Sequence, residues 1–438
     1  MSKLKFSQYN SLLKITSNSS VIYNSKEDKC MIIQQEMNDI LNFNPEEIKN
    51  YNPAILNDLK SIGALVPIDT DELQEVINLS KTVDNDESEF TLIINPTMNC
   101  NFKCWYCYES HILGSQLSQN TLKKVYRLID NILEQKKELK TFVLSFFGGE
   151  PLMYYKKTSM QIIDYIRAKY DQFPHINFSI NFTFNGYLVN DLILNHLKEG
   201  TESNHFQITL DGGEEFHNKV RDSGKKEGSY FKILDAIKLL IKNNIQVLLR
   251  INYTAENIDS VSGIEKDIRD ILVIDRENLT IGMFRVWQDD KGADIKDKVD
   301  STKLLFSASG FRIDINETIL DNLKNPCYAD KKNELLINFN GDIYKCTARD
   351  FSQENKYGTL NENGEVDWID DKLNEWENIK IQSKACQSCR ILPLCGGGCH
   401  QANLETKGLD TCQMGYNDDD KDNVIMMRLS EYFVNEEV

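Results

Sequence analysis

The stretch LIINPTMNCNFKCWYC, residues 92–107, places three cysteines directly after a short apolar run. The run has the length and composition of a buried β-strand. The cysteines follow it with C-x3-C-x2-C spacing and are Cys100, Cys104 and Cys107. Three thiolates on one loop can bind three irons of a cubane cluster and leave the fourth iron open for another ligand. The alternative is a zinc site in which His111 completes the thiolate set.

Strand and helix patterns alternate through the next 200 residues or so. Strands are expected at 92–94, 141–147, 178–184, 206–210, 247–253 and 279–287, and helices at 117–133, 159–169, 189–197, 230–242 and 258–272. This alternation predicts an α/β fold in which a parallel sheet, covered by helices, forms a partial (β/α)6 TIM-like barrel. Reactive groups are then expected where the strands end and the loops begin.

The composition limits the compartment and the partners. The 438 residues include 50 Lys plus Arg and 67 Asp plus Glu, a formal charge of −17, which disfavours nucleic acid and anionic membrane as partners. The opening MSKLKFSQYN has no apolar signal core, and no run approaches the roughly 20 apolar residues of a membrane span. We therefore expect a cytoplasmic protein. In a reducing compartment the 11 cysteines indicate metal or redox chemistry rather than disulfides.

Gly148-Gly149-Glu150-Pro151 follows the second expected strand. Together with the cysteine spacing, this loop resembles the radical S-adenosylmethionine (SAM) enzymes, and the resemblance extends over the whole body. It implies a [4Fe-4S] cluster on the first three cysteines and SAM bound to its open iron, with the GGEP loop receiving the amino group of the methionine moiety. It further implies that Tyr106 lies by the adenine, Asn185 by the ribose and Arg250 by the carboxylate.

The segment Thr209-Leu210-Asp211-Gly212-Gly213, with His217 and Arg221, resembles the loop after the fourth strand in radical SAM enzymes that modify peptides and proteins. Asp211 and Arg221 can shape the site. A structural ion pair between them is the alternative.

Seven further cysteines lie in the last quarter of the chain, with the pattern C-x13-G-x4-C followed by C-x2-C-x5-C-x3-C-x12-C. They are Cys327, Cys346, Cys386, Cys389, Cys395, Cys399 and Cys412. Gly396, Gly397 and Gly398 allow backbone amides to approach sulfur closely. Taken alone, the pattern also fits a pair of zinc ribbons.

In this order the seven cysteines resemble the SPASM domain, which carries two auxiliary [4Fe-4S] clusters. The resemblance implies one cluster on Cys386, Cys389, Cys395 and Cys412. It implies a second on Cys327, Cys346 and Cys399, for which no fourth cysteine lies within 328–345. Cys30 is the remaining cysteine. An open iron in the second cluster could bind a substrate thiolate, and a solvent or non-cysteine ligand is the alternative.

Residues 1–88 form a third predicted unit. The runs 12–15 and 21–23 flank a turn-prone Ser-Asn-Ser-Ser and indicate a hairpin, a helical spacing follows at 31–41, and Pro45 and Pro53 can each begin a helix. The stretch 84–89 is acidic and linker-like. This unit resembles the winged-helix-like leader-recognition module of peptide maturases. A cap on the barrel is the alternative. The expected domains are therefore 1–88, 89–300 and 301–438.

The resemblance implies a maturase that acts on a ribosomally made precursor peptide through a 5′-deoxyadenosyl radical, with flavodoxin or ferredoxin as electron donor. A thioether from Cys to a carbon of another residue is the expected product, and carbon–carbon and ether links are alternatives. Formylglycine formation, as in anaerobic sulfatase maturases, is less consistent with Thr347, where those enzymes carry Asp. A non-enzymatic iron–sulfur electron carrier would have no use for a cofactor loop. No proton acceptor has a diagnostic spacing.

Overall fold

The computed structural model describes residues 3–34, 37, 41, 47–48, 53–224, 226–275, 277–289, 294–314, 320–406 and 410–435. The chain divides into two compact units. One, here called the barrel unit, comprises Glu87–Ile315 and Asn333–Ile369. The other, the terminal unit, joins both ends of the chain and comprises Met1–Asp86, Asn316–Lys332 and Asp370–Val438. The segment Asn333–Ile369 thus packs with the barrel, whereas the sequence division grouped it with the C-terminal cysteines.

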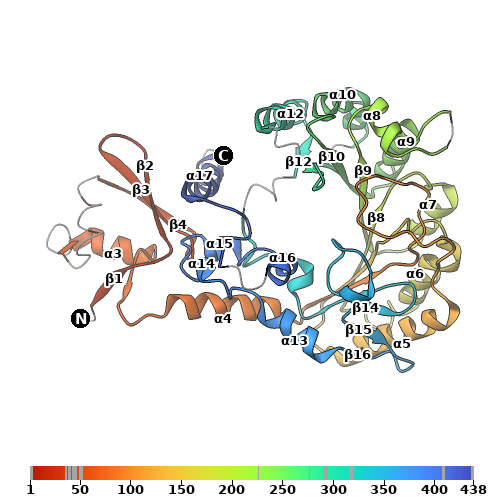
Figure 1. The fold of residues 1–438 in the computed structure, drawn as a ribbon, viewed down its shortest axis with the longest axis horizontal. Coiled ribbons are helices and arrows are strands. Elements are labelled where there is room, and N and C mark those ends of the chain that lie inside the picture. The colour runs from red at the N-terminus through yellow and green to blue at the C-terminus, as the bar shows by residue number, and fades with distance from the viewer. Residues whose placement is uncertain are drawn as a thin grey trace. The chain divides into compact units, whose positions relative to one another are not determined.

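An 11-stranded sheet forms the centre of the barrel unit, in the order β12-β11-β10-β9-β8-β7-β6-β13-β14-β15-β16 (Figure 1). Its strands are β6 (Glu89–Ile94), β7 (Thr141–Phe146), β8 (Asn177–Phe184), β9 (Ser203–Leu210), β10 (Gln246–Tyr253), β11 (Leu279–Arg285), β12 (Arg312–Ile313), β13 (Glu334–Ile337), β14 (Asp342–Tyr344), β15 (Gly358–Leu360) and β16 (Val366–Trp368). Neighbours from β6 to β11 are parallel and follow chain order, which confirms the partial barrel. The antiparallel extension β14–β16 was not predicted from the sequence.

Helices between the strands cover the outer face of the sheet (Figure 1). They are α5 (Gln119–Gln135), α6 (Ser159–Arg167), α7 (Asp191–Leu197), α8 (Glu214–Val220), α9 (Tyr230–Ile241), α10 (Ile258–Ile268), α11 (Ile271–Ile274) and α12 (Lys296–Ala308), with short 3-10 turns η2 (Tyr155–Lys157) and η4 (Gln353–Asn355). In α5 the apolar side chains Leu122, Val125, Ile129 and Ile132 recur at helical spacing and are buried. Each such side chain contributes roughly 1.5–3 kcal/mol of hydrophobic stabilisation.

The opposite face of the sheet is polar. In β8 the phenylalanines and isoleucine alternate with Ser179, Asn181 and Thr183, and only the apolar set is fully buried. Asn181 and Thr183, together with Gln207 and others, line a cavity of about 310 Å³ within the barrel unit. The inside of this barrel is therefore a polar hollow, whereas a closed barrel fills it with apolar side chains.

The terminal unit contains a three-stranded antiparallel sheet, β2-β3-β4, and a two-stranded sheet, β1-β5. Its elements are β1 (Leu4–Phe6), β2 (Asn10–Lys14), β3 (Ser19–Asn24), β4 (Lys29–Gln34), α3 (Pro53–Ser61), β5 (Leu65–Pro67), α4 (Glu72–Asp84), η3 (Tyr328–Asp330), α13 (Asp370–Asn378), α14 (Lys384–Gln387), α15 (Leu392–Cys395), α16 (His400–Glu405) and α17 (Asp418–Asn435). The predicted hairpin is confirmed by the pairing of Leu12 with Ile22, and the predicted start at Pro53 by α3.

The predicted helix at 31–41 is wrong at its start. Met31 pairs with Ile22 and Gln34 with Ser19, so this segment belongs to β4. Residues 35–36 and 38–40, and the helix start at Pro45, lie outside the described residues. The acidic stretch 84–89 begins as the last residue of α4 and ends as the first residue of β6, so the connection is shorter than expected. None of the described helices is both long enough and apolar enough to span a bilayer.

Candidate cofactor and iron–sulfur sites

The glycine pair after β7 forms a turn that only glycine fits. Gly148 and Gly149 have φ of +75° and +53°. A Cβ on Gly149 would lie 2.5 Å from the backbone oxygen of Asn99, and one on Gly148 would lie 2.5 Å from Cγ of Asn95. The amide of Glu150 donates to the Asn99 oxygen at 2.9 Å. The turn is therefore held directly against the segment that leads into Cys100.

Glu150 is fully buried and joins two loops at the ends of strands. Its Oε1 accepts from the amide of Leu152 at 3.0 Å and its Oε2 from the amide of Asn185 at 2.9 Å. Burial raises the pKa of Glu150 to about 7, although both amides and Arg221 favour the ionised form. The carboxylate that the sequence suggested for an ammonium group is thus engaged with backbone amides. Pro151 follows it in a turn and is buried.

The Asn185 side chain reaches the first cysteine loop. Its Nδ2 donates to Oδ1 of Asn101 at 2.8 Å, and its Oδ1 accepts from the amide of Tyr187 at 2.9 Å. Asn185 is buried. The structure thus brings the predicted ribose-contact residue next to the C-x3-C-x2-C motif, where it also orders the loop.

Asn95 was not singled out from the sequence and has unmet hydrogen-bonding capacity. It follows β6 directly and has no exposed surface. Neither of its side-chain amide atoms has a hydrogen-bond partner within the described part of the chain. Buried polar groups are normally paired, so a missing polar partner is indicated. A buried free amide beside a glycine turn fits the amino-acid end of a bound SAM.

The hydroxyl group of Tyr106 forms hydrogen bonds with residues at the ends of β9 and β10. The hydroxyl donates to the Asp211 carboxylate and accepts from Nη2 of Arg221 at 2.9 Å and Nδ2 of Asn252 at 3.0 Å. Arg221 forms a buried ion pair with Asp211. Burial raises the pKa of Tyr106, and the Asp211 charge raises it further while Arg221 opposes the shift.

His217 lies against the same ion pair. Burial lowers the pKa of His217 to about 3, so the ring is neutral, and its Nδ1 accepts from the amide of Asp211 at 3.2 Å. The alternative of a structural ion pair between Asp211 and Arg221 is therefore observed, and the pair also positions a residue of the cysteine loop.

Arg250, the predicted carboxylate contact, lies in β10. Its Nε donates to Oδ1 of Asn252 at 2.9 Å, and its guanidinium group stacks 3.9 Å from the ring centre of Phe284 on β11. Because Asn252 also contacts Tyr106, Arg250 belongs to the same polar network on the sheet. Asn252 was missed from the sequence, and its place near the end of a strand was the available signal.

The three thiols of the first loop lie in a setting that favours a bound cation. Burial raises the pKa of Cys100 to about 12 and that of Cys107 to about 11, and it also raises the pKa of Cys104. The charges of Glu150 and Glu109 add to the shifts of Cys100 and Cys107. Thiolates that lie beside carboxylates need positive charge, which iron supplies. The donor set fits a cluster on these residues.

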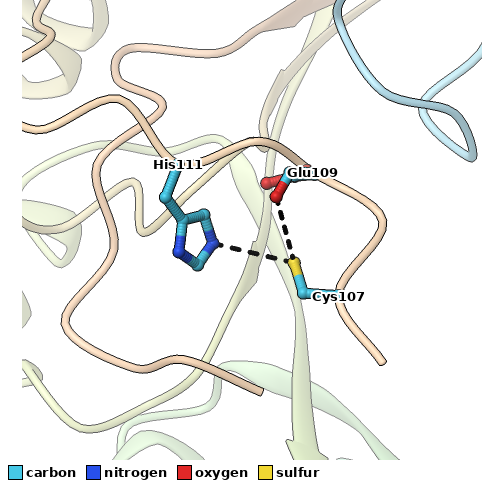
Figure 2. Close-up of side chains that lie close together, drawn as sticks. All are labelled: Cys107, Glu109 and His111. Carbon is cyan, nitrogen blue, oxygen red and sulfur yellow. Dashed lines mark hydrogen bonds between the residues drawn. The ribbon is translucent and has the colours of Figure 1, made fainter. Parts of the chain in front are cut away.

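Glu109 and His111 lie beside Cys107, as Figure 2 shows. His111 Nε2 is 3.7 Å from Cys107 Sγ, and the candidate ligand atoms of all three residues lie within 4.8 Å of one another. Glu109 Oε2 accepts from the amide of Gly149 at 2.7 Å, which joins the cysteine loop to the glycine turn. Glu109 was missed from the sequence. The position of His111 beside Cys107 is therefore also compatible with the zinc alternative.

In the terminal unit, four C-terminal cysteines converge. Cys395 is partly buried, and its pKa is raised to about 11, first by burial and then by the neighbouring thiols of Cys386, Cys389 and Cys412. The backbone amide of Gly397 donates to Cys395 and opposes the shift, so the glycine run does supply a hydrogen bond to sulfur. Four converging thiols are the donor set of a closed cluster or a zinc site.

The other three C-terminal cysteines are divided between the units. Cys346 lies in the barrel unit and accepts from the amide of Ala348 at 3.3 Å. Cys327 and Cys399 belong to the terminal unit and are exposed. Their assignment to one cluster remains a prediction from the sequence pattern. Cys30 lies in β4 and, like Cys389 and Cys395, packs against an apolar cluster of the terminal unit.

Comparisons with known proteins agree with this geometry. Residues 94–268 match the model of the Radical SAM superfamily. A cysteine-type anaerobic sulfatase-maturating enzyme of Clostridium novyi is 25% identical over 357 residues, which is 71% of this chain and 88% of the relative.

Two solved structures share the fold. The structure of anSMEcpe with bound AdoMet has a TM-score of 0.54 and 17% identity, and it covers 79% of this chain and 99% of its own. Streptococcus suis SuiB has a TM-score of 0.53 and 14% identity, and it covers 93% of this chain and 98% of its own. The segment that matches the Radical SAM model, residues 94–268, contains both the cysteine loop and the glycine turn.

Proposed function

We propose that this enzyme modifies a ribosomally made precursor peptide by joining a cysteine sulfur to a carbon of another residue. The observation that carries the proposal is the composition of the terminal unit. In it the strands β1–β5, here called the N-terminal β-module, and a four-cysteine centre belong to one compact body. A radical SAM barrel alone would need neither. The module offers a place for a leader segment, and the extra cysteines offer redox centres.

Coverage by the solved structures supports the peptide substrate. SuiB bound to its precursor peptide SuiA covers 92% of this chain, with a TM-score of 0.52. The structure of anSMEcpe with AdoMet and the Cp18Cys peptide covers 79%, with a TM-score of 0.55. The fold of a protein that binds a precursor peptide therefore extends over more of this chain than the fold of anSMEcpe.

The leader segment is proposed to bind along β4. This strand is an outer strand of the β2-β3-β4 sheet among the described residues, and Ile32 on it is 59% exposed. An extended peptide can add to such an edge through backbone hydrogen bonds, while apolar side chains provide selectivity. Recognition of the leader peptide by residues 1–88, which the sequence predicted, thus remains a proposal.

When bound, the cluster and SAM supply a 5′-deoxyadenosyl radical that removes hydrogen from an unactivated carbon. The residues of the chain position these groups. The Asn95 amide and the glycine turn would hold the amino-acid end of SAM, Tyr106 would lie against the adenine, and Arg250 would face the carboxylate.

The thioether is proposed because the sequence pattern gives the second auxiliary cluster only Cys327, Cys346 and Cys399 as recognised ligands. An open iron there can hold the substrate thiolate. The balance is one hydrogen atom to the deoxyadenosyl radical, one proton from the thiol and one electron to the auxiliary clusters. An electron donor such as flavodoxin or ferredoxin would reduce the first cluster.

The test is modification of the precursor peptide encoded near the gene. The expected product has lost two hydrogens per link and has one cysteine protected from alkylation, as measured by mass spectrometry. A product in which every cysteine remains alkylatable contradicts the thioether. Truncation of the leader should abolish modification while leaving uncoupled SAM cleavage unchanged.

Formylglycine formation is the second candidate, because the sulfatase-maturating relative is 25% identical over 71% of the chain. This reaction converts a single cysteine and forms no link between residues. Its product carries an aldehyde that reacts with a hydrazine probe. A hydrazine-reactive product without a cross-link would replace our proposal.

A further inference from the structure

The loop that carries Cys389 is hydrogen-bonded to the N-terminal strands. Arg390, the next residue, donates from Nη1 to the hydroxyl of Ser11 in β2 at 2.7 Å. The hydroxyl of Ser25, just after β3, donates to the backbone oxygen of Arg390 at 2.5 Å. All of these residues belong to the terminal unit. The cysteine loop is thus hydrogen-bonded to β2 and to the residue that follows β3.

Apolar packing joins the same two regions. Tyr9 has no exposed surface and packs in one cluster with Val76 and Leu392, against Cys386 and Cys389. In a second cluster, residues of the hairpin pack with residues next to the cysteines. This cluster consists of Leu13, Val21, Tyr23, Leu320, Ile391, Leu394, Val424, Ile425 and Leu429, with Cys30, Cys389, Cys395 and Tyr416 at its edge. The cysteines therefore border the apolar contacts of the hairpin.

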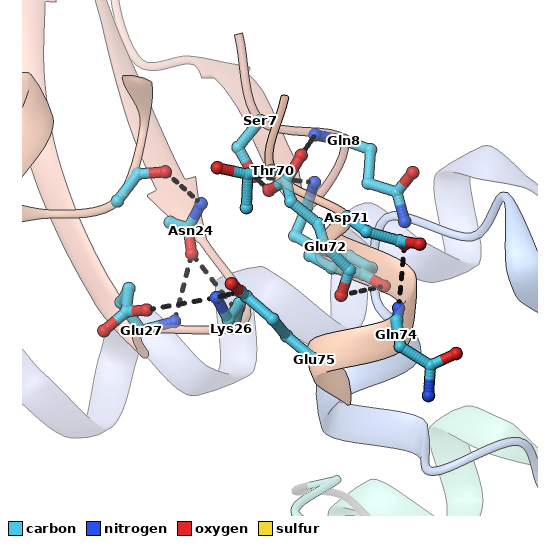
Figure 3. A network of polar contacts seen from close by, with 12 residues as sticks. Ser7, Gln8, Asn24, Lys26, Glu27, Thr70, Asp71, Glu72, Gln74 and Glu75 are labelled. Atoms are coloured by element: carbon cyan, nitrogen blue, oxygen red, sulfur yellow. Dashed lines mark hydrogen bonds and ion pairs between the residues drawn. The ribbon is translucent and has the colours of Figure 1, made fainter. Parts of the chain in front are cut away.

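Helices α17 and α4 also contact the residues of the N-terminal hairpin. Arg428 of α17 forms an ion pair with Asp28, which also accepts from the Tyr23 hydroxyl. Figure 3 shows how the first turn of α4 is held, where Glu72 accepts from the Ser7 hydroxyl and Glu75 pairs with Lys26. The hairpin is thus enclosed by elements that also contact the cysteine loop.

The loop itself has little regular structure to support it. α14 and α15 have only 4 residues each, too few for a stable helix without tertiary support. Small domains with limited cores often depend on a metal centre for their fold. Without a bound metal, the thiols of Cys386, Cys389, Cys395 and Cys412 have no attraction for one another.

We propose that the metal centre on Cys386, Cys389, Cys395 and Cys412 is the structural support of the N-terminal β-module and thereby of leader recognition. The identity of the metal as iron, and of the module as the leader site, rests on the proposed function. Metal binding fixes the loop, the loop fixes Arg390 and the apolar contacts, and these hold β2 and β3 in place. Loss of the centre therefore loosens a strand pair more than 300 residues away in the chain.

The test is hydrogen exchange by mass spectrometry on the anaerobically reconstituted enzyme and a Cys386→Ala/Cys395→Ala variant. The expected result is loss of about a third of the iron and at least roughly tenfold faster exchange in Asn10–Asn24, with β6–β8 unchanged. The matched control is Cys100→Ala/Cys104→Ala/Cys107→Ala, which should lose similar iron without altering exchange in Asn10–Asn24. Unchanged exchange in the first variant overturns the proposal.

Arg390→Ala keeps every cysteine and serves if the double variant fails to fold. It should retain the full iron content and still accelerate exchange in Asn10–Asn24. Wild-type exchange in this variant also overturns the proposal. The readout needs no peptide, so a precursor that is never modified would count against the proposed function alone.

Discussion

The two cysteine regions are held in opposite ways. The loop at Cys100–Cys107 follows a central strand and is fixed by buried groups from its own barrel, namely the glycine turn, Asn185 and the Asp211–Arg221 pair. The Cys386–Cys395 loop lies on short helices and takes its support from residues at the other end of the chain, with 365 positions between Ser25 and Arg390. The first is a site within an established scaffold, and the second is part of what holds its scaffold together. Metal loss should therefore affect chemistry in the first case and structure in the second.

The largest expected effect comes from the first loop. Cys100→Ala/Cys104→Ala/Cys107→Ala should remove about four of about twelve irons and abolish SAM cleavage under dithionite, because no open iron remains to bind the cofactor. Iron analysis and chromatography of 5′-deoxyadenosine give the readouts. The barrel should keep its thermal unfolding temperature within a few degrees. Cleavage that survives in this variant would mean that the cofactor site lies elsewhere.

The glycine turn gives a sharper test of the same region. Gly149→Ala should lower SAM cleavage about 100-fold, since a Cβ at 2.5 Å from a backbone oxygen must displace the turn. The matched control is Gly114→Ala, which has a similar φ of +72° but no atom within 4 Å of its Cβ. It should cost about 1–2 kcal/mol of local strain without changing cleavage. If both variants cleave SAM equally, the close approach of the turn to Asn99 has no role.

The contrast also explains what could be predicted from the sequence. The expected strand at 178–184 and helix at 159–169 match β8 and α6 closely, because their periodicity and burial arise from neighbours along the chain. The start of the 31–41 segment was predicted as helix from spacing, yet Met31 pairs with Ile22, and strand pairing overrode the local pattern.

The candidate site, like the fold, could be predicted from the sequence only where local patterns determine it. Motif spacing selected the cysteines and the glycine turn, which the structure brings together at the ends of adjacent strands. The orphaned amide of Asn95 and the engagement of Glu150 by two amides depend on how loops pack, and no spacing records them. Likewise, no local feature of Arg390 reveals its contact with Ser11.

A smaller effect is expected at Tyr106. Tyr106→Phe removes only the hydroxyl that joins the cysteine loop to Asp211, Arg221 and Asn252. A lost hydrogen bond worth about 1.5 kcal/mol corresponds to roughly tenfold slower SAM cleavage at full iron content. The change that SAM causes in the EPR spectrum of the reduced cluster should weaken as well. Tyr108→Phe is the control because it keeps the stacking on Trp287. An unaltered EPR response would show that the hydroxyl network does not position the cofactor.

The smallest expected effect is on how thermal stability depends on pH. Here a buried carboxylate of the barrel unit can be compared with one of the terminal unit. Burial raises the pKa of Glu150 from 4.5 to about 7, so its contribution to stability is fully present below pH 4.5 and is lost as the pH rises through about 7. Asp330 has a lowered pKa because His400 and Lys380 outweigh the effect of burial, so its contribution is present above its usual pKa and is lost only in acid.

Between pH 5.5 and 8, wild-type protein without SAM should therefore lose about 3 °C or more of unfolding temperature relative to Glu150→Gln, which has no proton to release. Asp330→Asn should lower the unfolding temperature at both pH values, because Asp330 remains ionised throughout this window. Anaerobic thermal unfolding followed by circular dichroism measures both. A Glu150→Gln variant with the same pH slope as wild type would show that Glu150 is already ionised at pH 5.5. The barrel would then stabilise this carboxylate as the terminal unit stabilises Asp330, and the electrostatic difference between the two regions would disappear.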